Sequence, residues 1–386
     1  MRIAILNTRV RILSIPKVYL PLWTHDLIRL MYSPNRTTLV PSEPFFYLTE
    51  NSVEWCVVAS IEAFETGFTI TRQARLQNIP GKTHSLTRDV YYVVQVENDD
   101  ENTDSGRPIL EMTAAFAGAN ITIMYISTYQ TDFMLIKQTD FQKAHDIWLE
   151  SDYDIVGLNE LAPWLHDLPP PRMPRTTSIN QDLPVASGFA NLAISEVEGG
   201  PREGLSTVPS FEQSRAATPP QPARLVMTDF RVRQMGLSYS RRREWIYNLI
   251  HALFLPETMG LSSRESRFIS YVVADEEISL IAPPHIINCL GSDHIRHHSQ
   301  ITYHRLFEIF YRNNLSRSGL VYDVSELMNE ADIELMYITT YHTACIVVRE
   351  SDFAAARVIL DSHEHVQNTD DGGDSSDEYA DDSLAA

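Results

Sequence analysis

The sequence predicts an α+β protein built from four repeated units, which are arranged as two homologous pairs. Two internal duplications support this prediction, because a repeated sequence defines the architecture of a chain more firmly than local propensities do. The first relates residues 124–131 to residues 336–343, which lie 212 positions further along. It continues without a gap, and ten of the 28 positions from Met124 to Ser151 are identical in the two copies.

The second duplication relates the beginnings of the two halves, with a constant offset of 222 positions. Residues 9–11, Arg-Val-Arg, recur as residues 231–233, and Trp23 corresponds to Trp245. The same offset relates Pro34 to Pro256. The chain is therefore predicted to consist of two homologous halves, each with two successive units.

Residues 90–157 indicate the order of elements within one unit. Residues 90–96 are rich in β-branched and aromatic side chains, which predicts a buried strand, and Pro108 suits the first turn of a helix that ends near Gly118. Strands are predicted at 121–128 and 132–137. Thr139 and Gln142 form a capping-box pattern for a helix to about Glu150, and a short strand follows at 153–156. This order is that of the ferredoxin-like (βαββαβ) fold.

The predicted boundaries follow from these patterns. The first unit spans 1–80, the second 81–158, the third 224–300 and the fourth 301–366. Residues 159–223 contain Pro169–Pro171 and many Ser, Thr and Gly, so they are predicted to form a disordered linker. Residues 367–386 are predicted to be an acidic, disordered tail.

The composition argues against several classes of protein. The formal net charge is −20, and the only dense basic run is Arg241–Arg243, which argues against nucleic-acid binding. Cys56, Cys289 and Cys345 are scattered, which fits a reducing compartment. The sequence shows neither a signal-peptide pattern nor an apolar stretch near the ~18–20 residues that span a bilayer. A cytosolic protein that does not bind membranes is expected.

Signatures of catalysis are missing from the sequence. It contains no Gly-rich phosphate loop, no GxSxG elbow and no HExxH helix, so we expect a non-enzymatic protein without catalytic residues or a cofactor. One cluster could suggest zinc, but its spacing matches no closed structural zinc pattern, and we expect a solvated insertion without metal. Its members are His285, Cys289, His294, His297 and His298.

Several segments resemble the CASTOR family of cytosolic arginine sensors. The most specific is the heptapeptide at 127–133, Ser-Thr-Tyr-Gln-Thr-Asp-Phe, and residues 9–14, 24–28 and 45–50 match in the same order. The resemblance is strong across 1–157 and weaker but collinear across 227–362. It implies four tandem ACT domains, which are ferredoxin-like units, and a homodimer. It also implies a free amino acid bound between the second and fourth units, and regulated docking on the GATOR complex upstream of the target-of-rapamycin kinase.

A ligand site is expected where the first helix of a unit begins, because free backbone N–H groups and the helix dipole favour a carboxylate there. In the fourth unit, Arg317, Ser318 and Gly319 precede a predicted helix at 320–330, and Gly319 would let a ligand approach the backbone. By resemblance, the facing residues are Thr122, Ile123, Thr340 and Tyr341. The alternative is that these residues are ordinary packing and loop positions.

The sequence departs from the resemblance at two of the implied ligand positions. Arginine-sensing members carry acidic residues at the positions that match Arg317 and Ala344. A guanidinium group favours a paired carboxylate, whereas Arg317 repels it and Ala344 offers no partner. We therefore hypothesise that this protein binds arginine poorly or not at all. Its ligand would be neutral or acidic, or it would have none.

A partner surface is expected at the turn of the heptapeptide. Tyr129, Gln130 and Asp132 lie between two predicted strands, where neighbouring side chains face opposite ways and at least one must be exposed. By resemblance, these residues contact the GATOR partner. The alternative is that Thr131 and Asp132 simply form the turn.

Three functions remain open at this stage. The first is an amino-acid-binding regulator that acts through a GATOR-like partner. The second is a scaffold that kept the partner surface and lost its ligand, which Arg317 and Ala344 motivate. The third is a regulatory subunit of an amino-acid biosynthetic enzyme, because pairs of ACT domains often serve that role.

Overall fold

The computed structural model describes most of the chain outside the predicted linker and tail. All described residues belong to one compact unit, formed by Met1–Ala162 together with Pro219–Ala386. No helix in this described part is long and apolar enough to cross a membrane. The described residues are 1–32, 45–67, 83–97, 106–151, 153–157, 223–228, 230–260, 267–274, 277–296, 302–311, 314–362 and 366–368. Apart from their ends, the predicted linker and tail lie outside them.

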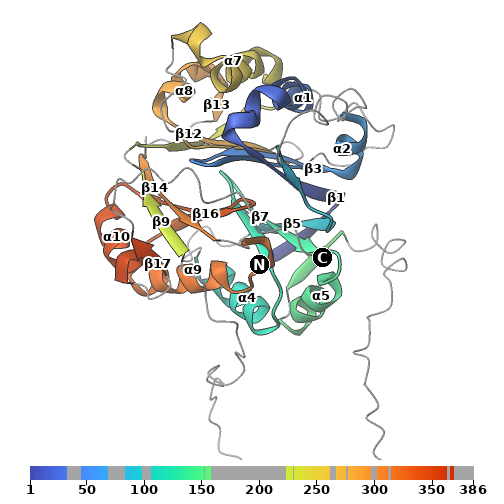
Figure 1. Ribbon diagram of the computed structural model, residues 1–386. Helices are drawn as coiled ribbons and strands as arrows, with labels where there is room; N and C mark the ends of the chain where they lie inside the picture. Colours follow the sequence, from blue (N-terminus) through green and yellow to red (C-terminus); the bar gives the residue numbers. More distant parts are fainter. Residues whose placement is uncertain are drawn as a thin grey trace, which may run out of the picture. The chain divides into compact units, whose positions relative to one another are not determined.

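The first and third units supply one layer of antiparallel strands with helices on its outer side (Figure 1). The elements of the first unit are β1 (Arg2–Pro16), η1 (Lys17–Tyr19), α1 (Leu20–Tyr32), β2 (Phe45–Glu50), β3 (Glu54–Ser60) and α2 (Ile61–Gly67), and the short strand β4 (Ser85–Leu86) joins the same layer. Those of the third are β10 (Arg233–Leu237), α7 (Arg242–Phe254), η2 (Pro256–Met259), β11 (Ile269–Ala274), β12 (Glu277–Ala282), α8 (Pro284–Asn288), η3 (Ser292–His294) and β13 (Ile295–Arg296). Because β2 pairs with β11, the strands of both units form one continuous layer.

The second and fourth units form a second layer in the same way, and their helices cover its opposite face (Figure 1). The second unit contains β5 (Tyr91–Glu97), α4 (Gly106–Gly118), β6 (Ile123–Ser127), β7 (Asp132–Lys137), α5 (Phe141–Glu150) and β8 (Asp154–Val156). The second half supplies β9 (Ala223–Met227), β14 (His304–Phe310), η4 (Asn314–Ser316), α9 (Leu320–Glu330), β15 (Leu335–Thr339), β16 (Thr343–Arg349), α10 (Phe353–Ser362) and β17 (Val366–Asn368). β6 of the second unit pairs with β15 of the fourth.

β1 belongs to both layers, which the sequence did not predict. Its last residues, from Val10, pair with β3, whereas its first residues pair antiparallel with β5 of the second unit. The strand predicted at 153–156 does form, as β8, but it pairs in parallel with the start of β1 and not with β5. β4, which lies within the predicted second unit, pairs with the end of β1. Because β1 pairs with strands on both sides of the predicted boundary at residues 80 and 81, the unit boundaries remain predictions.

The two layers pack face to face, and each also packs against its own helices. One buried cluster lies between α1, α7 and the first layer, and it includes Trp23, Trp55, Trp245 and Tyr271. A second cluster joins strands of both layers, with Val58, Phe133 and Val347 among its members. Alternating side chains of a strand point to opposite faces, so the same strands can contribute to both clusters. The result is a four-layer arrangement of helices, strands, strands and helices.

The duplications correspond to repeated elements. α1 and α7 have the same length and lie 222 positions apart, and α5 and α10 lie 212 positions apart. The predicted capping box of α5 is wrong. The residue before the helix is Asp140, which makes no capping bond through its side chain. The third residue of the helix is then Lys143 and not Gln142, and the Gln142 amide instead donates to Asp146, one turn further along, at 2.9 Å.

Candidate functional site

α4 and α9 pack against each other beside the paired strands β6 and β15, and the start of α9 lies next to the end of α4. Gly319 precedes α9 with a φ of 84°, in the left-handed region that favours glycine. Among the described residues, no side chain caps the helix there. Ser318 donates a hydrogen bond of 2.7 Å from its hydroxyl to Oδ1 of Asn120, just beyond α4. Free N–H groups of the first turn of α9 are therefore available to an anionic group.

A small cavity lies at this junction. Ile121 and Ile123 line it from the second unit, and Arg317, Gly319 and Tyr322 line it from the fourth. Its free volume is about 10 Å³, which suffices for about one water molecule. A free amino acid cannot enter in this conformation, so binding at this place requires the cavity to widen.

Arg317 gives the cavity a positive charge. Its guanidinium lies 5.3 Å from the ring centre of Tyr311, a cation–π contact that holds the side chain beside the cavity. Burial raises the pKa of Tyr311 to about 12, even though the charge of Arg317 acts in the opposite direction. Ala344 is fully buried in β16 and does not line the cavity. Arg317 therefore disfavours a cationic ligand at this junction.

The predicted ligand residues do not all meet at one place. Ile123, Arg317 and Gly319 line the cavity, and Ser318 lies beside it. Thr122 is half-buried just before β6 and does not line the cavity.

Thr340 and Tyr341 do not line the cavity either. The Thr340 hydroxyl instead donates to Oε1 of Glu54 in the first unit at 2.8 Å. The turn after β15 is therefore hydrogen-bonded to the first layer, and it does not form part of the ligand cavity.

Glu54 is one of two carboxylates that clamp repeated turns, and sequence reasoning missed both. Glu54 begins β3 and accepts hydrogen bonds from Thr340, from the Ser14 hydroxyl and from the His342 backbone N–H, the last at 2.8 Å. Glu277 begins β12 and clamps the heptapeptide turn of the second unit in the same way. The sequence signal for them was an acidic residue at the first position of each of two corresponding apolar strands.

The clamp by Glu277 uses both of its carboxylate oxygens. Oε1 accepts from the Thr128 hydroxyl at 2.6 Å and from the Gln130 backbone N–H at 3.1 Å. Oε2 accepts from the Thr131 hydroxyl at 2.8 Å. The second-unit turn is thus fixed to the third unit, just as the fourth-unit turn is fixed to the first.

The three predicted partner residues differ in exposure. Tyr129 packs its ring against Gly236 of β10, where a Cβ atom would lie only 2.7 Å from the ring. Its backbone N–H donates to the Ser279 hydroxyl at 2.9 Å. Gln130 is exposed, whereas Asp132 is half-buried. Gln130 is therefore the member of this set that is most accessible to a partner.

Asp132 should make stability depend on pH. Burial raises its pKa to about 6, although the hydroxyls of Tyr125 and Ser127 favour the charged form. In the unfolded chain the pKa of the Asp132 carboxyl is near ~3.9, so it loses its proton at a lower pH than in the folded state. The free energy of unfolding therefore falls as pH rises from about 4 to about 6. Asp132→Asn should flatten this slope and stabilise the fold by about 1–2 kcal/mol at pH 7.5. Urea unfolding at pH 4.5, 6 and 7.5 measures both effects, and an unchanged slope would contradict the assignment.

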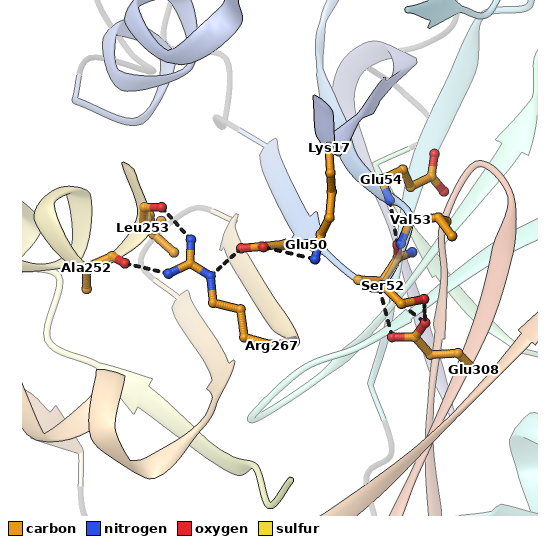
Figure 2. A network of polar contacts seen from close by, with 10 residues as sticks. Lys17, Glu50, Ser52, Val53, Glu54, Ala252, Leu253, Arg267 and Glu308 are labelled. Carbon is orange, nitrogen blue, oxygen red and sulfur yellow. Dashed lines mark hydrogen bonds and ion pairs between the residues drawn. The ribbon is translucent and has the colours of Figure 1, made fainter. Parts of the chain in front are cut away.

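A second buried polar cluster surrounds the turn between β2 and β3 (Figure 2). Glu50 pairs with Arg267 at 2.8 Å and with Lys17 at 3.3 Å, and burial still raises its pKa above the usual value. Glu308, on the fourth unit, accepts hydrogen bonds from the backbone N–H and the hydroxyl of Ser52. Burial raises the pKa of Glu308 as well. These contacts join the first unit to the third and to the fourth.

The described residues contain no group of three or more His, Cys, Asp or Glu side chains arranged to hold a metal ion. Within the predicted His and Cys cluster, the Cys289 thiol lies 3.2 Å from the backbone oxygen of His285. Burial raises the pKa of that thiol. His297 and His298 lie outside the described residues.

Comparisons with known proteins agree with this architecture. Residues 87–147 match the ACT domain family. A protein named cytosolic arginine sensor for mTORC1 subunit 1 from Homo sapiens is 28% identical over 182 residues, which cover 46% of this chain and 50% of that protein. Its counterpart from Rattus norvegicus is 30% identical over 143 residues, covering 36% and 39%. The chain thus spans half or less of the length of these relatives.

A solved structure of aspartate kinase from Synechocystis is also similar, with a TM-score of 0.31 and 10% identity, covering 93% of this chain and 54% of that one. Similarity at this level supports no functional comparison. The repeated units have the predicted tandem ferredoxin-like fold, and the second of them is similar to an ACT domain at residues 87–147. The predicted resemblance to the cytosolic arginine sensors is confirmed by the curated relatives.

Proposed function

We propose that this chain is a non-enzymatic, cytosolic sensor that binds a free amino acid at the N-terminus of α9. It would act as a homodimer on a GATOR-like complex in target-of-rapamycin signalling. The observation that carries this proposal is the uncapped start of α9 at Gly319, which faces the second unit in a chain similar to cytosolic arginine sensors. A helix N-terminus of this kind suits the carboxylate of an amino acid.

Ligand binding would select a wider form of the cavity. The free volume of about 10 Å³ holds no amino acid, so the start of α9 must move away from α4 and the bond between Ser318 and Asn120 must break. A ligand that binds only this wider form shifts the population towards it. Because Arg317 lines the cavity, the ligand should be neutral or acidic and not arginine.

β6 connects the cavity to the partner surface. It begins at Ile123, which lines the cavity, and ends at Ser127, directly before the turn with Gln130. A five-residue strand spans roughly 17 Å, and it is rigid enough to carry a displacement along its length. Widening of the cavity would then change how the turn lies against Glu277, and so change partner affinity.

A second function is favoured by two observations at the same place. The narrow cavity and the positive Arg317 both suit a scaffold that holds the partner without any ligand. In that case the turn at Gln130 would keep its role and amino acids would have no effect on partner capture.

Affinity capture of the GATOR-like complex by the full chain, with and without each amino acid, tests these functions. We expect Gln130→Ala to reduce capture at least about tenfold, because an exposed contact in the centre of an interface can contribute that much. The matched control is His342→Ala, the equivalent exposed position in the fourth unit, which should capture normally. Capture that changes with a neutral or acidic amino acid supports the sensor. Capture that no amino acid changes supports the scaffold, and undiminished capture by Gln130→Ala contradicts both.

A further inference from the structure

A groove much larger than the α9 cavity is lined in part by η4, and the groove and the cavity share no lining residue. Its free volume is about 290 Å³. Residues from four places in the chain line it: the connection between β4 and β5, the end of β7, η4, and the turn after β15. The polar side chains that line it include those of Thr87, Arg88, Asp89, Lys137, Asn314 and His342. Its size suits a small metabolite.

The groove carries one positive charge that no described residue pairs with. Lys137 pairs with Asp89 at 3.2 Å, so these two charges balance. Arg88 is exposed, and no ion pair to it occurs among the described residues. In a chain with a net charge of −20, a groove with this excess of positive charge favours an anionic group, and a guanidinium binds a carboxylate through two parallel hydrogen bonds.

Asn314 adds a buried acceptor without a partner. The residue is 3% exposed, and its amide nitrogen donates to the backbone oxygens of Thr340 at 2.8 Å and Thr343 at 2.9 Å. These two bonds fix the orientation of the amide, so the other atom is Oδ1. Oδ1 is buried and accepts no hydrogen bond among the described residues. A buried acceptor left in this state is unfavourable, and a donor that reaches it would be bound.

We propose that this groove binds a small organic acid that carries a hydrogen-bond donor beside its carboxylate. The carboxylate pairs with Arg88 and Lys137, and a small shift of the groove wall uncovers Oδ1 of Asn314, which is buried in this conformation, so that the donor bonds to it directly or through one bound water. Both α-amino acids and α-hydroxy acids have this chemistry. The site is separate from the α9 cavity and does not depend on the function proposed for it.

Titration calorimetry of the full chain with alanine, glutamate, lactate and malate tests this site. We expect at least one of them to bind, and Arg88→Ala to weaken its binding at least about tenfold, since it removes a charge-assisted contact. Preference for the amino or the hydroxy acids identifies the donor. The matched control is Arg243→Ala, an exposed arginine on α7, which should bind like the unaltered protein.

Two further variants separate this site from the α9 cavity. Arg317→Ala changes only the cavity, so it should leave binding in the groove intact while it changes any ligand effect on partner capture. Asn314→Asp keeps an oxygen in place of Oδ1 but adds a negative charge, and it should also weaken the acid. The proposal is overturned if none of the four acids binds below about 10 mM, or if the unaltered protein and Arg88→Ala bind equally.

Discussion

Arg267→Ala should lower the free energy of unfolding by about 3–5 kcal/mol at pH 7.5, because it leaves Glu50 buried without its closest cation. Arg267 is itself largely buried and contacts Glu50 at 2.8 Å. It also donates to the backbone oxygens of Ala252 and Leu253 near the end of α7, at 2.8 and 2.5 Å (Figure 2). One substitution therefore breaks an ion pair and removes hydrogen bonds from a helix terminus. Urea unfolding measures the loss.

The pH dependence of this effect distinguishes charge from packing. Burial already raises the pKa of Glu50, and removal of Arg267 raises it further. As pH falls, Glu50 becomes protonated and no longer needs a cation. The difference in free energy of unfolding between the unaltered protein and Arg267→Ala should therefore become smaller. Adding Glu50→Gln to Arg267→Ala should also recover part of the stability. The matched control is Arg357→Ala, an exposed arginine paired with Asp361, which should change stability by less than about 0.5 kcal/mol.

Glu54→Ala should lower the free energy of unfolding by about 3–4 kcal/mol, because it leaves three donors without their acceptor. Glu54 is 1% exposed and accepts from Ser14, Thr340 and the His342 backbone. Since these donors come from the first and the fourth units, the loss should also weaken the contact between the two layers. Chemical unfolding monitored by tryptophan fluorescence measures the effect.

A suitable control for Glu54 is Glu334→Ala. Glu334 is 61% exposed, and its one ion pair within the described part of the chain is with the exposed Arg349, so its removal should have little effect on stability. Glu54→Gln keeps the shape of the side chain, so its free energy of unfolding should lie between those of Glu54→Ala and Glu334→Ala. An equal and small effect for Glu54→Ala and Glu334→Ala would mean that the clamp does not stabilise the fold.

The elements of the fold were largely predictable from the sequence. The repeats, with their constant offsets, indicated that each half carries the same elements, and the paired helices α5 and α10 lie where the offset places them. The pairing of β1 with both β3 and β5 was not predictable, because strand pairing between distant residues leaves no local pattern. The capping box failed for a local reason: the helix begins one residue later than the pattern requires, so Gln142 is its second residue and not its third.

The candidate site was only partly predictable. Ile123, Arg317 and Gly319 do line one cavity, and helix-start chemistry had pointed to Arg317 and Gly319. Thr340 was assigned to the same site by resemblance, but its hydroxyl bonds to Glu54. The unpaired Oδ1 of Asn314 could not be found without coordinates, because an acceptor is unsatisfied only in relation to its neighbours.

The sequence by itself determined the repeated units, the strands and helices within them, and the positive charge that Arg317 brings to a ligand position. These depend on side-chain periodicity, turn residues and residue identity, which act over a few positions. Only the tertiary structure decided which layer holds each turn, how much room the cavity leaves, and that Glu54 and Glu277 act as clamps. These features arise from contacts between residues more than 140 positions apart, and the packing of whole layers sets those contacts.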